Sequence, residues 1–306
     1  MNKNNHKTEN GAVLVVVAVS LVALLGISAF TVDIGYLQYQ KRHLQNTADA
    51  ASLAGAREYI DGDSSLENIT KIVKDYVQLN GVNDEEVEKV TLSKKFESAE
   101  NNAVTVDIKG NRDIFFGKIF GIQNSDIGVT ATAIAAPVSG MKEGLLPFYF
   151  TEGALSNIEY GKIFDKFDVE NPFNKPPGNW GTTSFFLTGQ DVVNDWIQYG
   201  YDGKVVKIGD DINLKPGAGL NSIRNYLKYL KGNKYAIPIV KDFTPPGGGA
   251  SQPGEVIGFI GIEVTDIGDK GANLFIEVKF LEMIAIGEID PPTAPNYKLQ
   301  ALRLIE

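Results

Sequence analysis

The sequence contains no cysteine and only two histidines, His6 and His43, among its 306 residues. The absence of cysteine excludes disulfides, thiolate nucleophiles, cysteine-ligated zinc and iron–sulfur clusters. Because both histidines lie near the N-terminus, the rest of the chain cannot supply a Ser-His-Asp triad or a histidine-rich metal site. We therefore predict that the protein is not an enzyme and has neither a cofactor nor a metal centre.

Basic residues are also in deficit, since 29 Lys and Arg face 38 Asp and Glu, for a net charge of −9. Nucleic acid is not an expected partner, because phosphate neutralisation requires clustered Lys and Arg. Neither GxGxxG nor GxxxxGK[ST] occurs, so no glycine-rich phosphate loop is predicted. Acidic clusters such as Asp210-Asp211 lack the ligand spacing of a calcium loop, and we interpret them as turns and solvated faces. A small-molecule substrate is not expected.

Four residues invite a comparison with glycoside hydrolases, which use paired carboxylates: Asp191, Asp195, Trp180 and Trp196. Asp191 is better explained as a residue in the first turn of a helix, where negative charge is favoured, and the two tryptophans are better explained as core residues.

One long apolar run dominates the N-terminal region. Residues 11–32 carry no charged side chain and are numerous enough to cross a hydrocarbon core of about 30 Å as a helix. A cleaved signal peptide has a shorter apolar stretch of about 7–15 residues and a small-x-small cleavage site, and a buried core helix seldom lacks charge for so long. We therefore predict a single-pass membrane anchor, with the signal peptide and the core helix as alternatives.

The charges that flank this run do not fix its orientation. Lys3 and Lys7 precede it, whereas Lys41, Arg42 and Arg57 follow it. We expect residues 1–10 to form a short cytoplasmic tail, residues 11–60 to form one helix that is both the membrane span and a stalk, and the body to be extracytoplasmic.

The helix is predicted to continue beyond the membrane, because no proline occurs between residues 11 and 60. A seam of apolar and small residues recurs at three- and four-residue steps, with Asp33 directly before it. Small residues allow close approach of a neighbouring backbone. The seam either packs against copies of the chain or a partner, or docks on the chain's own globular domain, and a sequence pattern does not decide between these. Its members are Ile34, Leu37, Leu44, Ala48, Ala51 and Gly55.

Asp33 ends the apolar run, and two roles are open for it. It is either a plain interfacial residue or a counter-charge within a helix bundle, since carboxylates near bilayer depth are costly unless paired.

The rest of the body reads as α+β. Residues 61–140 show a helix with Ser65 as its N-cap, two alternating strands at 87–93 and 103–110, a short apolar helix at 114–120 and a strand at 127–136. Residues 141–306 are richer in Gly and Pro, and we predict a mainly antiparallel sheet or small barrel with two helices. The expected strands there are 203–208, 235–243, 255–266, 272–285 and 297–305, and the helices 191–199 and 220–231.

The N-terminal residues resemble the TadE/TadG-like proteins of the tight-adherence (Flp) pilus system. The resemblance is carried by the apolar run, by the V-D-x-G-x-L step at residues 32–37 and by the L-Q-N-x-A-D-A-A-x-L-A run at 44–54. The stretches FFGKIFGI at 115–122 and VTATA at 129–133 extend it, and it becomes weak beyond about residue 137.

The resemblance implies a non-enzymatic, membrane-anchored protein that supports assembly or anchoring of a Tad/Flp-type pilus at the cell surface, with other pilus-assembly proteins or copies of itself as partners. In peptidase-processed pilins, Glu follows the cleaved Gly at the fifth position. Counted from Gly11, that position is Val16, which favours an intact anchor. Two alternatives remain: a pilin-like filament subunit packed through its N-terminal helix, and a surface-displayed binding module using Trp180, Trp196, Tyr199 and Tyr201.

Overall fold

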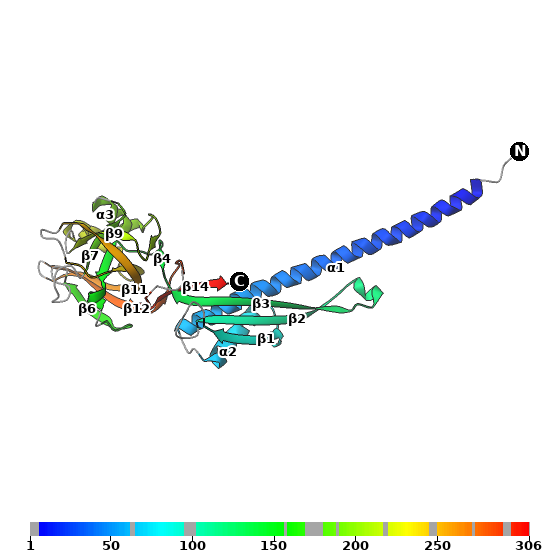
Figure 1. Cartoon of the computed structure of the whole chain (residues 1–306), viewed down its shortest axis with the longest axis horizontal. Coiled ribbons are helices and arrows are strands. Elements are labelled where there is room, and N and C mark those ends of the chain that lie inside the picture. The colour runs from blue at the N-terminus through cyan, green and yellow to red at the C-terminus, as the bar shows by residue number, and fades with distance from the viewer. Residues whose placement is uncertain are drawn as a thin grey trace.

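A single long helix projects from a body made of two β-rich units (Figure 1). The computed structural model describes residues 6–61, 65–94, 102–155, 158–168, 180–187, 190–216, 220–244, 250–270, 273–289 and 295–305. The N-terminus lies at the free end of the helix, and the second β-rich unit lies at the opposite end of the molecule (Figure 1).

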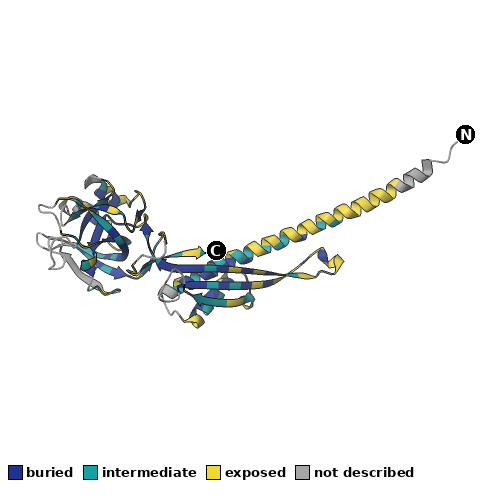
Figure 2. Ribbon diagram, viewed as in Figure 1, coloured by how far each residue is buried: buried dark blue, intermediate teal, exposed yellow. Residues whose placement is uncertain are grey.

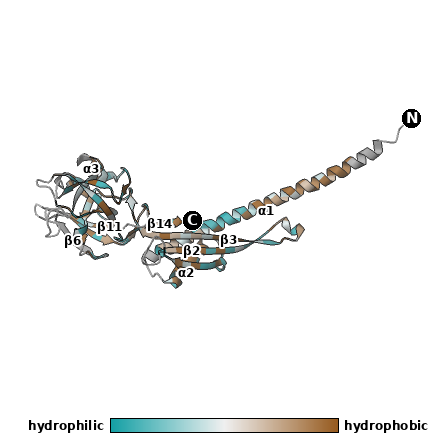
Figure 3. Cartoon of the chain, viewed as in Figure 1, coloured by the Kyte–Doolittle hydropathy of each residue, from teal (hydrophilic) through white to brown (hydrophobic). Residues whose placement is uncertain are grey.

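Helix α1 runs without a break from His6 to Asp61, which is 56 residues and therefore about 84 Å of helix. It has two distinct parts. Residues 13–32 are nearly all solvent-exposed, whereas buried positions recur from Asp33 onward (Figure 2). The exposed part is also the most apolar part of the helix (Figure 3). It is long and apolar enough to cross a membrane by length and composition.

The first unit packs the second part of α1 and helix α2 (Leu66–Leu79) on one sheet. Ser65 caps α2 as predicted, because its side chain accepts a hydrogen bond from the Asn68 N–H. The sheet has the order β1-β2-β3-β14-β13. A short 3₁₀ helix, η1 (Asp84–Glu86), precedes β1. The strands are β1 (Val87–Ser93), β2 (Ala103–Asp113), β3 (Asn124–Pro137), β13 (Met283–Ile284) and β14 (Leu299–Ile305).

Strand β14 returns from the second unit to the sheet of the first unit. It pairs antiparallel with β3, from Gln300 opposite Pro137 to Ile305 opposite Thr132. The first sheet therefore contains residues from both of the segments that composition separated at residue 140. Composition does not predict that β14 pairs with β3, because the sequence of a strand does not indicate which strand it pairs with.

The second unit is a mainly antiparallel sheet that closes on itself. Its order is β10-β5-β7-β9-β11-β12-β6. An additional pairing between β10 and β11, the first and fifth strands of this order, closes the first five strands into a small barrel. The long strand β11 makes this possible, because it pairs successively with β9, β10 and β12. The strands are β5 (Phe148–Thr151), β6 (Ile163–Asp168), β7 (Trp180–Phe185), β9 (Asp211–Pro216), β10 (Lys234–Val240), β11 (Gln252–Lys270) and β12 (Asn273–Leu281).

Helices α3 (Gln190–Tyr199) and α4 (Leu220–Leu227), the short helix η3 (Glu152–Leu155) and the small β4–β8 pair, Gly140–Met141 with Val206–Lys207, complete this unit. The mixed α+β class, the long N-terminal helix and the two C-terminal helices are as predicted. The expected strand at 203–208 is reduced to β8, and the strands β5, β6, β7 and β9 were not foreseen, because glycine and proline interrupt the alternation around them.

The predicted helix at 114–120 is also shorter than expected. Only the 3₁₀ helix η2 (Gly117–Phe120) forms, and Gly121 ends it in the left-handed conformation at φ 83°. The N–H groups of Phe115, Phe116 and Gly117 are bonded to the side chain of Asp33. The apolar pattern therefore marks a surface-facing turn and not a helix of two turns.

Candidate functional site at the junction of α1 and the β2–β3 turn

Asp33 is held by the turn between β2 and β3, residues 114–123, which we call the β2–β3 tip. One carboxylate oxygen accepts hydrogen bonds from the N–H groups of Phe115 and Phe116, at 2.9 and 3.1 Å. The other accepts from Phe116 at 3.0 Å and from Gly117 at 2.7 Å. Asp33 is only 6% exposed. A carboxylate with this many backbone donors forms a strong, charge-assisted anchor.

Aromatic contacts lie on both sides of Asp33. The rings of Tyr36 and Phe115 meet edge to face with centroids 4.9 Å apart, and the rings of Phe30 and Phe120 lie 6.5 Å apart. Phe30, Asp33 and Tyr36 are spaced three residues apart, so they share one face of α1. The tip therefore follows this face toward the N-terminus of α1 and reaches the level of Phe30, inside the apolar run.

Most of the apolar side chains of the tip are exposed, although Phe115 and Phe120 also contact rings of α1. In contrast, Ile114 and Gly117 are buried under the turn. A β-carbon on Gly117 would lie 2.6 Å from the side chain of Ile114, so glycine is needed where the turn approaches Asp33. The exposed residues are Phe115, Phe116, Ile119, Phe120 and Ile122.

The predicted seam of α1 divides in the structure. Leu44, Ala48, Ala51 and Gly55 are buried against α2 and the first sheet of the same chain, and Leu37 is partly buried beside them. Ile34 is exposed. The small residues bring α1 close to its neighbours: a β-carbon on Gly55 would lie 3.0 to 3.3 Å from side chains of Val104, Val73 and Ile69. An interface between copies through the seam remains a prediction. Ile34 is the seam residue whose side chain is exposed and could contact a second copy.

A second polar contact fixes α1 on the sheet at Gln40, C-terminal to Asp33. Arg112 on β2 makes a two-pronged ion pair with Glu86, at 3.1 and 2.7 Å, and its Nε donates to Gln40 of α1 at 3.2 Å. Both charged side chains are about four-fifths buried. Gln45 adds a bond from its amide to the carbonyl of Thr130 on β3. These contacts define which face of α1 meets the sheet.

The aromatic residues proposed for a binding surface in the second unit are mostly core residues. Trp180, Trp196 and Tyr201 are buried, and Tyr199 alone of the four is exposed. The Trp196 indole N–H donates to Asp202 at 2.8 Å, and the rings of Trp196, Tyr201 and Phe185 pack on one another. The observation that motivated a surface-displayed binding module is therefore absent. Asp195 lies on α3, whereas the side chain of Asp191 is outside the described residues.

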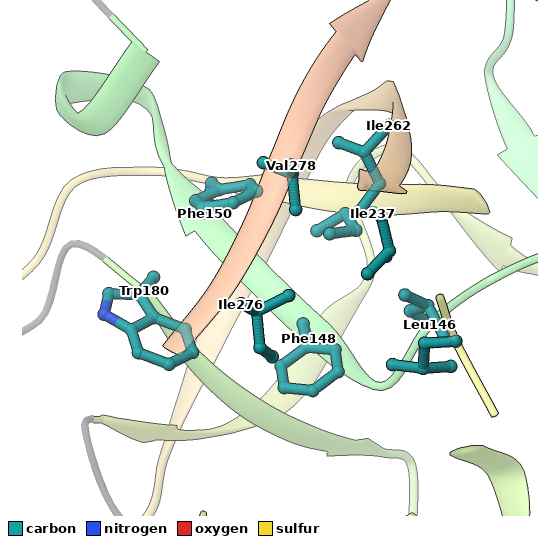
Figure 4. A pocket seen from close by; sticks show the side chains of 10 residues that line it. Leu146, Phe148, Phe150, Trp180, Ile237, Ile262, Ile276 and Val278 are labelled. Atoms are coloured by element: carbon teal, nitrogen blue, oxygen red, sulfur yellow. The ribbon is translucent and has the colours of Figure 1, made fainter. Parts of the chain in front are cut away.

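A small cavity lies in the core cluster that side chains of β5, β7, β10, β11 and β12 form with α3 and α4 (Figure 4). Its volume is about 30 Å³, and its lining offers apolar surface only. A ligand site needs several hundred Å³ and a few convergent polar groups, so this cavity is a packing void. Ten side chains line it: Leu146, Phe148, Phe150, Trp180, Leu230, Ile237, Ile262, Val264, Ile276 and Val278.

Among the described residues, no group of three or more His, Asp or Glu side chains is placed to hold a metal ion. In the acidic pair Asp210-Asp211, the carboxylate of Asp210 accepts a hydrogen bond from the N–H of Lys207 in the turn before β9, and Asp211 begins that strand.

The sequence marks Asp33 and the apolar stretch at 114–120 separately, but it does not predict their contact. The two segments are 82 to 84 residues apart, and no local pattern links an acid at the end of a helix to the N–H groups of a distant turn. The run of Phe and Ile interrupted by Gly and Lys gives no signal for this contact, because it fits a buried helix as well as an exposed turn.

Comparison with known families gives two matches. Residues 11–58 match a family described as putative Flp pilus-assembly TadE/G-like. Residues 41–133 match one described as putative Tad-like Flp pilus-assembly. Together they include the apolar run, the seam, Asp33 and the β2–β3 tip. No curated protein and no solved structure gives a significant match to the chain.

Proposed function

The N-terminal part of this chain belongs to the Flp pilus-assembly TadE/G-like family, and from this premise we propose a non-enzymatic, membrane-anchored protein that supports assembly or anchoring of a Tad/Flp-type pilus at the cell surface. In this proposal α1 crosses the membrane once, and the two β-rich units are extracytoplasmic. Its partners are the membrane and other pilus-assembly proteins or copies of the chain.

The observation that carries the proposal is the division of α1 at Asp33. Before Asp33 the large side chains are exposed on every face, for example Val16, Leu21 and Leu25. An apolar helix surface of this length is stable in lipid and unfavourable in water. After Asp33 the helix is packed on α2 and the first sheet. The body is therefore attached rigidly to the apolar part of α1, without a flexible linker between them.

The rigid connection suits a role in assembly. A helix that is continuous from the membrane into the body transmits the orientation of the anchor to the β-rich units, since an α-helix bends only gently without proline or a break. The second unit would then be presented at a fixed distance and direction from the membrane surface.

The experiment is fractionation of cells that express the full chain, followed by external protease treatment and intact-mass measurement. We expect a full-length chain in the membrane fraction whose body is cleaved by protease added outside. A soluble, monomeric, full-length chain in the cytoplasm would contradict the proposal.

A second candidate is a pilin-like filament subunit, and one observation favours it. The apolar part of α1 projects freely from the body, and Ile34 and Tyr39 remain exposed on the packed part. Such a helix can be covered by identical helices in a filament core as well as by lipid. In that case sheared filaments would contain this polypeptide, and intact mass would show a chain starting at Ala12 or near Thr31.

A further inference from the structure

We propose that the β2–β3 tip is a second membrane-contacting element, which inserts its exposed apolar side chains into the interface of the leaflet on the body side. This inference rests on the proposed anchoring of α1 in a membrane and specifies how the body sits on that membrane. The occupant of the tip surface is the lipid that surrounds the end of the apolar run.

The level of the tip along α1 is the first argument. Asp33 directly follows the last residue of the uncharged run, and its carboxylate holds the N–H groups of the tip. Phe120 lies against Phe30, which is three residues, or about 4.5 Å, further into the run. If residues 11–32 cross the bilayer, the outer part of the tip lies at the depth of the membrane interface.

The chemistry of the tip is the second argument. Ile119 is 78% exposed, and Phe115, Phe116, Phe120 and Ile122 are also exposed. Exposed apolar patches are costly in water but are typical of membrane-contacting surfaces, where aromatic and aliphatic side chains enter the boundary between head groups and acyl chains. The half-exposed Lys118 lies among them, and its ammonium group can reach lipid phosphates while its stem remains in apolar surroundings.

The third argument is the hydrogen bonding of the tip backbone. Unpaired N–H groups are expensive where water is scarce. Asp33 accepts from three of them, and the N–H groups of Ile119, Gly121 and Ile122 bond to carbonyls within the tip. The same hydrogen bonds also satisfy the carboxylate of Asp33, which would be unfavourable at the edge of a bilayer without partners. The tip is therefore an irregular turn whose polar groups face inward and whose apolar groups face outward.

A second contact beside α1 would have a mechanical consequence. One helix can rotate about its own axis and tilt in the bilayer, whereas a helix and a tip inserted side by side fix both angles. The body would then face one direction relative to the membrane, as an assembly platform requires.

The experiment uses the full chain in vesicles of phosphatidylethanolamine and phosphatidylglycerol. Because the sequence has no cysteine, a single introduced cysteine carries one environment-sensitive fluorophore. The test variant is Ile119→Cys. The matched control is Leu79→Cys at the end of α2, since Leu79 is 79% exposed in the same unit but does not belong to the tip. Leu21→Cys, in the middle of the apolar run, reports the anchor itself.

We expect the Ile119 probe to lose its fluorescence to nitroxide-labelled lipid and to resist aqueous iodide, and the Leu79 probe to behave in the opposite way. An Ile119 probe that iodide quenches as fully as the Leu79 probe overturns the tip proposal. An Ile119 probe protected from both quenchers also overturns it, because a second copy or another protein then covers the tip.

The Leu21 probe separates the two proposals. Quenching of Leu21 by lipid together with quenching of Ile119 by iodide means that the anchor is correct and the tip is wrong. If lipid quenches neither probe, both the anchoring and the tip insertion are wrong.

Discussion

The carboxylate of Asp33 accepts a 2.7 Å hydrogen bond from the N–H of Gly117, which lies 84 residues later in the chain. This bond and its neighbours join the end of the apolar run to the turn between β2 and β3. Because both residues lie in the region that matches the pilus-assembly families, the junction belongs to the part of the chain that the families describe. The contact ties the position of the first sheet to the point at which α1 leaves the apolar run.

The first prediction concerns Asp33→Asn. The amide has one acceptor oxygen where the carboxylate has two, and it adds two donors that face the N–H groups of the tip. We expect the backbone of residues 115–117 to exchange hydrogen faster and the first unit to lose about 1–3 kcal/mol of stability. Hydrogen exchange read by mass spectrometry and urea unfolding measure these effects.

The control for Asp33 is Asp113→Asn in the adjoining strand. Asp113 is 75% exposed and contacts Lys118 only at 3.7 Å, so its neutralisation should change stability by less than about 1 kcal/mol. Equal effects of the two substitutions would show that charge near the tip matters and that the specific bonds of Asp33 do not.

Much of the fold follows from local pattern, and the junction shows where such patterns stop. The uncharged run and the lack of proline predict α1, and the alternation at 87–93 predicts β1 to the residue. The tip is different, because its Phe and Ile residues are the same in a buried helix and in an exposed turn. What distinguishes the two is the tertiary structure, in which Asp33 binds the N–H groups at the start of the tip and Gly121, in the left-handed conformation, ends η2.

The second unit shows a similar limit. β7 and β9 pair with each other and with β5 and β11, but each is short and ends near glycine or proline, so neither stands out in the sequence. Trp180 and Trp196 were interpreted both as core and as possible surface residues, since large amphipathic rings serve in either place. Only the tertiary packing of the second unit decides that they are buried.

The second prediction concerns Arg112→Met. This change leaves the carboxylate of Glu86 mostly buried without its ion pair and removes the bond to Gln40. We expect a loss of about 2–4 kcal/mol in the free energy of unfolding, which is larger than for an exposed pair because the remaining charge is poorly solvated. Chemical denaturation monitored by circular dichroism measures it.

Lys109→Met on the same strand is the matched comparison for Arg112. Lys109 pairs with Asp126 at 3.2 Å, but both side chains are about half exposed, so its loss should cost at most about 1 kcal/mol. If the two variants were equally stable, the Arg112 pair would be an ordinary surface contact and would not fix α1 on the sheet.

The third prediction concerns alkaline pH. Burial raises the pKa of Tyr201 to about 12, with the charges of Asp202 and Asp210 adding to the effect. Burial likewise raises the pKa of Tyr160 to about 12. An unfolded tyrosine ionises near pH 10, so the unfolded state releases these protons first as pH rises. Stability that is fully present below about pH 10 should therefore decrease between about pH 10 and pH 12.

Urea unfolding at several alkaline pH values tests the third prediction. The midpoint should fall as pH rises through this window, and the fall should be smaller in Tyr201→Phe, which has no phenol to ionise at that position. A midpoint that is constant up to pH 12 would mean that these phenols ionise as readily in the folded protein as in the unfolded chain.

The last prediction uses two glycines of α1 that differ only in their surroundings. A β-carbon on Gly55 would meet Val104, Val73 and Ile69 at 3.0 to 3.3 Å, whereas one on Gly35 would meet nothing within 4 Å. Gly55→Leu should therefore overpack the contact of α1 with α2 and β2 and cost about 1–3 kcal/mol or more. Gly35→Leu should be neutral or slightly stabilising, because leucine favours a helix over glycine by up to about 1 kcal/mol. Thermal unfolding of the purified chain in detergent, where copies are separated, measures both variants. If the seam served only an interface between copies, Gly55→Leu would leave the isolated chain as stable as Gly35→Leu does. That result would mean that α1 is packed too loosely on α2 and the first sheet to fix the orientation of the helix relative to the body.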